Sequence, residues 1–510
     1  MRRRVTVPIP GASPQAISDA AATLDGRPAP GIPASDATLQ VEAFSDRITA
    51  TASTNVHIPW FGWFFHPSLI LALRRAARWA ATTTAARAAN QPDPEPPRTP
   101  KLLPPAPFTP AQARALGVLA GLVAIANYGG SLVGQSTKYV AKSFAASETA
   151  LTTGLAVTRI GVLVTLFAAA IADRRGRRIT LLVAVVGICL ANLATALAPN
   201  LAAFTAAQTF TRGFTSGALT IAAIAAVEEA PEGARAWSFA MMSLAGGAGY
   251  AVGVILLPLS DLAGNAWRVA FGVSALSLAV IPFMARDLTE TRRYENVTRQ
   301  VVHRGRIREL FDRRYGKRFA ILGGVFFLTA VATTPVAQLT NQFLGDERGF
   351  SGLDITLFRT LTNGVPGIIG VVVAGRLAER EGRRPLAVIG IAVSTLLNAA
   401  FFLGPSWMLW VASTTAILAA ALAGMAIGTL DHELFPTEVR GTSGGFITVC
   451  GVLGSVTGLL LTGFLTDVTG SLGGALALLG FAPLCAALFL APFLPESARL
   501  ELDEVSPSER

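Results

Sequence analysis

The residues of this chain that could do chemistry are a few charged side chains set inside long apolar stretches. Arg159 and Arg212 lie well inside two such stretches, and no aspartate or glutamate lies in the middle of any of them. Arg212 precedes Glu228 by 228−212 = 16 residues, which is about 24 Å of helix. A buried guanidinium without a carboxylate partner is costly, so an anion from outside the chain is a natural counter-charge. We expect Arg212 in the first place, and Arg159 in the second, to attract a carboxylate. The alternative is that they cap backbone carbonyls or face water.

Polar side chains also repeat every three or four residues in two apolar stretches, and residues at this spacing share a helix face. We expect both stripes to line a binding cavity near the middle of the membrane, and the alternative for each residue is a hydrogen bond between helices. A third arginine, Arg359, lies nearer the end of its stretch, with Asp354 as its candidate partner. The residues of the two stripes are Asn127, Tyr128, Ser131 and Gln135 in the first and Gln338, Asn341 and Gln342 in the second.

A charged signature occurs twice. Residues 173–178 read Asp-Arg-Arg-Gly-Arg-Arg, and residues 379–384 read Glu-Arg-Glu-Gly-Arg-Arg, with their glycines 382−176 = 206 residues apart. A Glu-x-x-Pro-x-x-x-Arg element also recurs, at 228–235 and at 433–440, and its prolines are 436−231 = 205 apart. Glu290 and Glu496, which follow a leucine by two residues, are again 496−290 = 206 apart. Three markers with one offset indicate a duplicated half.

The elements that must carry these residues are membrane-spanning helices. Hydrophobic residues make up 52% of the 510 residues, charged residues make up 15%, and the mean hydropathy is +0.51. Apolar runs of about 20 residues cross the hydrocarbon layer as helices, and the sequence predicts twelve of them in an all-α membrane protein, six in each half. We place them near 114–137, 150–172, 179–198, 201–228, 235–259, 266–285, 319–343, 352–377, 385–404, 407–431, 440–465 and 472–494.

The distribution of basic residues predicts the orientation. Arginine and lysine crowd residues 1–113, the 173–178 loop, the 286–318 connector and the 376–384 loop, whereas the alternate loops hold few. Cytoplasmic loops carry the excess of Lys and Arg, so we expect both termini in the cytoplasm of a bacterial cell with the chain in its inner membrane. The net charge of +10 then reports topology and contact with anionic lipid, not a nucleic-acid partner.

The duplication divides the chain into two six-helix bundles, 114–285 and 319–494, joined by the basic connector 286–318 and followed by a cytoplasmic tail at 495–510. Residues 1–113 form a cytoplasmic extension with a Pro-rich linker near 91–105. Aromatic residues at 58–65 and an arginine-bearing apolar helix after them suit a segment in the membrane interface, or a helix packed under the bundle. A short strand at 39–52 is a further expectation. The three cysteines lack metal-ligand spacing, and no cleaved signal peptide is visible.

The paired loops resemble the signature of the major facilitator superfamily, Gly-x-Leu-Ala-Asp-Arg-x-Gly-Arg-Arg, over roughly residues 114–500. The Glu-x-x-Pro-x-x-x-Arg elements look like those of its metabolite-symporter and sugar-porter branches. The resemblance implies a cytoplasmic gate, in which Glu228 pairs with Arg440 and Glu433 with Arg235. Arginines beside the acidic residue can also pair with Glu228 or Glu433, and each such latch must be weak enough to open. The gate residues are Asp173, Gly176, Arg177, Glu228, Arg235, Glu379, Gly382, Arg383, Glu433 and Arg440.

These features favour a secondary transporter that takes up a small organic metabolite, driven by a proton gradient and without a bound cofactor or metal. Drug efflux by proton antiport is the alternative within the family, and a non-transporting sensor that signals through residues 1–113 is the alternative outside it. No nucleotide-binding loop or nucleophile constellation appears in the sequence, so we do not expect an enzyme. We expect a monomer. Glycines at 246, 247, 249 and 253 are expected to serve close helix packing.

Overall fold

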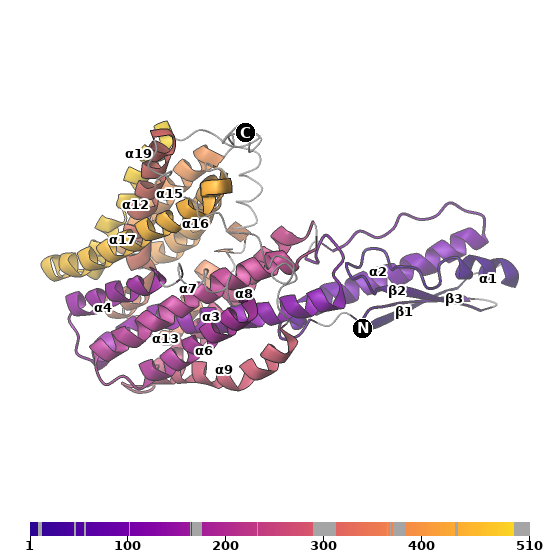
Figure 1. The fold of residues 1–510 in the computed structure, drawn as a ribbon, viewed down its shortest axis with the longest axis horizontal. Coiled ribbons are helices and arrows are strands. Elements are labelled where there is room, and N and C mark those ends of the chain that lie inside the picture. The colour runs from indigo at the N-terminus through magenta and orange to yellow at the C-terminus, as the bar shows by residue number, and fades with distance from the viewer. Residues whose placement is uncertain are drawn as a thin grey trace.

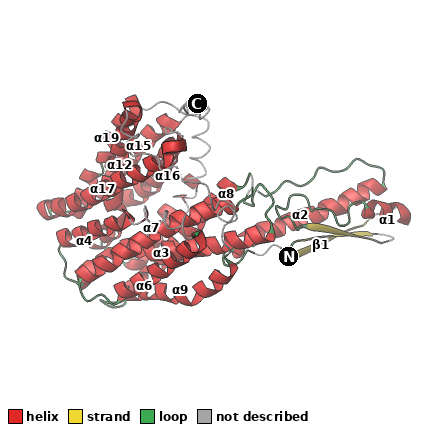
Figure 2. Cartoon of the chain, viewed as in Figure 1, coloured by secondary structure: helices red, strands yellow, loops and turns green. Residues whose placement is uncertain are grey.

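A computed structural model of the chain describes residues 1–8, 13–44, 47–55, 58–100, 102–163, 165, 176–231, 233–288, 313–364, 366–367, 369–370, 383–433 and 437–493. Figure 1 shows two helical bundles and a smaller domain that protrudes from one end of them. We call that end of the bundles proximal and the opposite end distal. Helices account for the bundles, and strands occur only in the protruding domain within the described residues (Figure 2).

The twelve predicted spans correspond to helical elements. Nine of the described helices are long and apolar enough to cross a membrane. The second span of each half and the last span are represented by shorter pieces. In the N-terminal half the elements are α3 (Pro110–Ser143), α4 (Glu148–Ile160) with the 3-10 turn η1 (Gly161–Leu163), α6 (Arg177–Ala196), α7 (Leu201–Glu229), α8 (Arg235–Ile255) with the 3-10 turn η2 (Leu257–Asp261), and α9 (Trp267–Asp287).

The C-terminal half repeats this order. Its elements are α12 (Arg313–Asp346), α13 (Gly352–Arg359) with the π-helical turn η3 (Thr360–Gly364), α15 (Arg383–Leu403), α16 (Ser406–Glu433), α17 (Thr437–Thr469), and α18 (Leu472–Leu479) followed by α19 (Ala482–Phe493). Side-chain caps begin several of these helices. Thr109 and Gln112 form a capping box at α3, and Ser351 and Asp354 form one at α13, which satisfies backbone N–H groups that the first turn leaves free.

The N-terminal 88 residues form a small α/β domain, where the sequence indicated at most one short strand. β1 (Arg2–Pro8), β2 (Thr38–Ala43) and β3 (Arg47–Ser53) make an antiparallel sheet in the order β1-β3-β2. α1 (Pro14–Ala22) and α2 (Gly62–Ala88) pack against it. Alanines of α2 are fully buried, and side chains this small let the helix approach the sheet closely. The strands are short, and β1 begins with three arginines, so the sequence lacks the strong alternation that would have indicated this sheet.

The position of α2 corrects the expected membrane-interface segment. Figure 1 shows α2 running away from the bundles, on from the proximal end of α3. The Pro-rich segment is not a free linker either, because it returns along α2. Trp79 Nε1 donates to the Pro94 carbonyl at 2.9 Å, and Arg87 binds Asp93 at 2.6 Å. The hydrogen bond from Arg87 lowers the pKa of Asp93.

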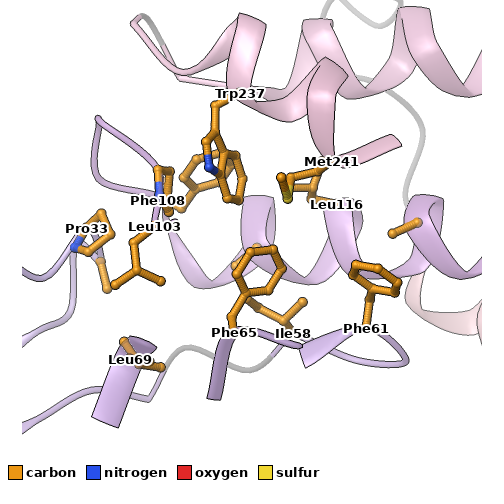
Figure 3. Close-up of a pocket in the computed structure, with 15 residues that line it drawn as sticks. Pro33, Ile58, Phe61, Phe65, Leu69, Leu103, Phe108, Leu116, Trp237 and Met241 are labelled. Atoms are coloured by element: carbon orange, nitrogen blue, oxygen red, sulfur yellow. The ribbon is translucent and has the colours of Figure 1, made fainter. Parts of the chain in front are cut away.

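The α/β domain docks on the N-terminal bundle through apolar residues. The rings of Phe65 and Phe108 pack against that of Trp237 in tilted arrangements, at centroid distances of 5.6 and 5.7 Å. Trp237 Nε1 donates to the Leu102 carbonyl at 3.2 Å. A pocket of about 50 Å³ lies at this junction, and Figure 3 shows its lining of aromatic and aliphatic side chains. The domain is therefore joined to the N-terminal half by a continuous apolar core.

Candidate substrate site and gates

A chain of polar contacts crosses between the two halves. Asn341 Nδ2 of α12 donates to Gln135 Oε1 of α3 at 2.7 Å, and Arg359 Nε of α13 donates to Asn341 Oδ1 at 3.0 Å. Gln135 and Asn341 are 4% and 2% exposed, so both amides are enclosed. The expected partner of Arg359, Asp354, instead accepts from the backbone and hydroxyl of Ser351. A capping box fixes that carboxylate at the start of α13 and holds it away from Arg359.

The two polar stripes lie in different surroundings, and most of the first stripe faces other helices of its own half. Asn127 packs against Gly246 of α8, where a Cβ would meet its Nδ2 at 2.1 Å. Tyr128 donates its hydroxyl to the Ala270 carbonyl of α9 at 2.6 Å, and Ser131 donates to the Tyr128 carbonyl. These three residues therefore make contacts inside the N-terminal half, and only Gln135 of the first stripe meets the other half. The reason is geometric: residues eight apart on a helix of 3.6 residues per turn differ in direction by about 80°.

The second stripe lies at the interface between the halves. The backbone carbonyl of Gln338 accepts a hydrogen bond from the Thr137 hydroxyl at 3.2 Å. The side-chain Oε1 of Gln338 is buried and has no hydrogen-bond donor among the described residues. Gln342 donates its Nε2 to Glu148 Oε1 at the start of α4. Together with Asn341, these residues place three amides of α12 against α3 and α4. Asn341 and Gln342 thus make the hydrogen bonds between helices that were the stated alternative, and the lining of a binding cavity by this stripe stays a prediction.

The two intramembrane arginines lie near each other, with no counter-ion among the residues that the structure describes. Arg159 of α4 is 7% exposed. Arg212 of α7 is partly exposed, but its Nε is enclosed and lacks an acceptor in the described part of the chain. The two guanidinium groups are close enough to repel each other electrostatically. By contrast, Arg268 and Arg348 at the distal end donate to backbone carbonyls of Ala196, Phe402 and Gly404.

The proximal gate is described only in its N-terminal half. Gly176 has φ +93° at the start of α6, a conformation that favours glycine. Arg177 binds Glu228 Oε1 at 2.9 Å, as the arginine-rich motif predicts. Glu228 therefore pairs within its own half here, and its pairing with Arg440 stays a prediction for a state with the proximal ends together. Arg235 is exposed at the start of α8. Asp173, Glu379 and Gly382, and the side chains of Arg383, Glu433 and Arg440, lie outside the described residues.

The two halves meet at the distal end, where sequence reasoning placed no gate. Hydrogen bonds between described residues of the two halves involve Gln135, Thr137 and Lys138 on α3, Glu148 and Thr149 on α4, Val254 on α8 and Asp261 on η2. Their partners lie on α12, α13 and α17 and in the α12–α13 connection. Toward the proximal end the two bundles diverge (Figure 1). The signal that could have found this gate is the position of Glu148 and Asp346 at the ends of two apolar stretches, which the sequence analysis did not single out.

A buried polar cluster inside the N-terminal half was also missed. Gln208 donates to Asn192 Oδ1 at 3.2 Å and to Thr195 Oγ1 at 2.8 Å, and Asn192 donates to Ser274 Oγ at 3.1 Å. All four residues are buried. They join α6, α7 and α9 by satisfied hydrogen bonds, so we interpret them as structural.

Two repeated helical halves that meet at one end and diverge at the other, in the described part of the chain, have the arrangement of a membrane transporter. The Major Facilitator Superfamily model matches residues 117–358 and 320–507, and the chain belongs to this family. Its family and structural neighbours are transporters and not enzymes.

Two similar proteins illustrate the range of relatives. A probable 4-methylmuconolactone transporter of Cupriavidus pinatubonensis is 25% identical over 72% of this chain and 89% of its own length. A probable galactarate/D-glucarate transporter of Escherichia coli is 26% identical over 28% of this chain and 32% of its own length.

The fold is similar to that of solved transporters. An inward-open structure of the xylose transporter XylE from E. coli matches with a TM-score of 0.63 at 17% identity, covering 76% of this chain and 98% of that one. The nucleoside transporter NupG matches with a TM-score of 0.63 at 12% identity, covering 74% of this chain and 100% of that one. Both likenesses concern the fold alone.

Proposed function

We propose that this transporter takes up a small organic anion, most simply a carboxylate, together with protons. The observation that carries the proposal is the pair Arg159 and Arg212. Two neighbouring cations inside the membrane, with no hydrogen-bond acceptor or carboxylate among the described residues, destabilise the unliganded protein. A carboxylate between them supplies the missing charge and accepts charge-assisted hydrogen bonds.

The proposal includes the α12 amides at the interface between the two halves as further groups for the substrate. Gln338 Oε1 has no hydrogen-bond donor among the described residues. Arg359 donates one of its N–H groups to Asn341. A hydroxyl group on the anion would donate to the Gln338 oxygen, so a hydroxylated acid suits the site better than a plain fatty acid. The name of one relative agrees with this chemistry, since galactarate and D-glucarate are hydroxylated carboxylates.

The orientation that supports uptake has the proximal end in the cytoplasm of a bacterial inner membrane. The described basic residues Arg177, Arg178 and Arg235 and the α/β domain lie at that end, which agrees with the positive-inside rule for a cytoplasmic face. The structure is then inward-facing, and transport proceeds by rocking of the two halves about the site. Import of an anion against an inside-negative potential costs about 2.3 kcal/mol per charge per 100 mV, and accompanying protons offset that charge.

The test is a thermal-unfolding screen of the purified full-length protein against hydroxylated carboxylates, neutral sugars and cationic drugs. A ligand that binds the folded state raises the melting temperature by mass action. We expect hydroxylated carboxylates to raise it for the parent, and Arg212→Gln to abolish the rise. Arg268→Gln is the matched control, because Arg268 donates to a backbone carbonyl away from the pair. It should lower the starting melting temperature and keep the ligand-induced rise.

Two results would contradict the proposal. If cationic drugs alone stabilise the protein, efflux is the better account. If carboxylates stabilise the parent and Arg212→Gln equally, the anion binds elsewhere and the arginine pair has another role.

A further inference from the structure

The distal gate contains a carboxylate that differs from all its acidic neighbours. We propose that Glu148 is the proton-binding site of this gate, so that protonation closes the distal end and loss of the proton opens it. The inference rests on the proposed function in one respect, since it supplies the site of coupling for an alternating-access transporter.

The contacts of Glu148 define one missing hydrogen. Its Oε1 accepts from Gln342 Nε2 across the interface between the halves. Its Oε2 is buried and has no hydrogen-bond partner among the described residues, and the same is true of the Oε1 of Gln342, a residue only 1% exposed. Both orphan atoms are acceptors, and buried acceptors without a donor are costly.

A single proton resolves this arrangement. A carboxylic acid and a primary amide form a pair of hydrogen bonds when the amide N–H donates to one acid oxygen and the acid O–H donates to the amide oxygen. The first of these bonds is present between Gln342 and Glu148. The two atoms that the second would join are the two that lack partners. A proton on Glu148 Oε2 therefore fastens α4 to α12, and with them the two halves of the molecule.

The neighbouring carboxylates already have partners of their own. Asp346 faces Lys138 and Lys142 of α3, and also Gln342. Glu347 accepts from the backbone N–H groups of Leu472 and Gly473 at the start of α18. Asp467 of α17 accepts the Thr149 hydroxyl. Glu148 is the carboxylate of this group that has no cation beside it and one oxygen without a donor.

The same neighbours give the direction of the effect. Asp346, Glu347 and Asp467 all belong to the C-terminal half and face Glu148 electrostatically. Ionised Glu148 repels them across the gate, whereas neutral Glu148 does not. These three carboxylates are exposed, so the cluster opens to the distal solution and a proton can arrive from there. Closure on protonation is the order that symport needs, because the gate shuts once the proton has bound.

The duplication supplies a matched control. Asp354 stands at 354−148 = 206 residues from Glu148, which is the repeat offset, and also lies at the start of the second helix of its half. Asp354 is exposed and caps its own helix through Ser351. It faces no orphan amide, so its neutralisation should leave the gate unaffected.

The experiment measures the distance across the distal end by pulsed electron paramagnetic resonance on the full-length protein in lipid nanodiscs, without substrate. Spin labels are placed on Ala263→Cys and Ser406→Cys, both exposed at the distal end, after replacement of the three native cysteines. Samples are frozen at steps from about pH 4 to about pH 9, a range that brackets ordinary and displaced carboxyl pKa values. The series is repeated with potassium in place of sodium.

We expect the long-distance, gate-open population of the parent to grow several-fold as the pH rises, equally in both salts. Glu148→Gln should hold the short distance at every pH, because its amide cannot ionise. Asp354→Asn should titrate like the parent. A Glu148→Gln protein that titrates like the parent, or a gate that follows sodium and not pH, overturns the proposal. A folded state for Glu148→Gln is checked by its melting curve, and Glu148→Ala, which should lose the pH response too, is a second variant.

This result stands apart from that of the anion screen. A gate that titrates through Glu148 in a protein that binds no carboxylate would leave the proton site intact and remove only the substrate class. If carboxylates bind the parent but not Arg212→Gln, and the gate does not respond to pH, the substrate class stands and the proton site is refuted.

Discussion

At the scale of single residues, Arg159 shows how binding and stability compete in this protein. Its guanidinium is buried, unpaired in the described part of the chain, and repelled by Arg212. Such a residue lowers the stability of the empty protein, and it is retained where a ligand makes use of the charge. Replacement of a residue that served only the fold would instead lower the stability of the ligand-free protein.

This gives a test that separates the two roles. Arg159→Met keeps the volume and removes the charge, so the ligand-free protein should gain stability on the order of 1 kcal/mol. Its melting temperature should rise, and the further rise caused by carboxylates should disappear. A melting temperature that falls by several degrees would mean that Arg159 stabilises the fold, which contradicts its assignment to the anion site.

At the scale of elements, the Pro-rich segment acts as a strap along α2. Trp79 and Arg87 of α2 hold it through Pro94 and Asp93. Asp93 has a pKa below its ordinary value because Arg87 donates to the ionised carboxylate. The contribution of this contact is therefore present above the unfolded-state pKa of about 3.9. It is lost as the pH falls through the lower, folded-state value.

Limited proteolysis of residues 89–105 checks this sign. At neutral pH, Asp93→Asn should be cut faster in the strap than the parent, because its amide no longer offers Arg87 a charge. Under acid conditions below the folded-state pKa, with an acid-active protease, parent and variant should be cut at the same rate. Equal rates at neutral pH would show that Trp79 and the backbone hold the strap alone. Asp19→Asn, an exposed carboxylate on α1, is the control.

At the scale of the whole molecule, the two halves repeat not only sequence motifs but also a close contact between two helices. A Cβ on Gly249 of α8 would lie 2.0 Å from the Ala124 carbonyl oxygen of α3, and one on Gly454 of α17 would lie 2.2 Å from the Phe327 carbonyl oxygen of α12. These glycines are 454−249 = 205 residues apart, the offset of the proline pair. Both halves therefore use a glycine to bring the same two helices together, as the sequence predicted for the glycines of α8.

Alanine substitutions of these glycines should distinguish the cost of a steric clash between helices from the gain in helix propensity. Gly249→Ala and Gly454→Ala should each cost about 1–3 kcal/mol, because a backbone carbonyl cannot move aside. Gly247→Ala is the matched control, since a Cβ there meets nothing within 4 Å, and alanine favours a helix by about 1 kcal/mol. Denaturation midpoints of the three variants would check this. Equal midpoints for Gly247→Ala and Gly249→Ala would contradict the close approach of α8 to α3.

The features that could be predicted from the sequence are those set by residues close together in the chain. The helical spans and the repeat follow from local patterns, and the structure confirms them. The ion pair of Arg177 with Glu228 is present, and its role as a latch stays a prediction. The partner of Arg359 and the direction of Tyr128 depend on how helices rotate against one another, which no single stretch encodes. The sheet of the α/β domain depends on pairing between β1 and β3, which are 45 residues apart at their first positions (47−2 = 45). Glu148 was overlooked because its partner, Gln342, lies in the other half.

The bond between Gln135 and Asn341 has a consequence for the origin of the molecule. The two residues occupy the same place in the two halves, since 341−135 = 206, and they meet each other. In a symmetric dimer, a residue on the two-fold axis meets its own copy. A primary amide can serve in such a place because it both donates and accepts. The ancestor of each half, before gene fusion, would then have paired with itself through one amide, of which glutamine and asparagine are the diverged descendants.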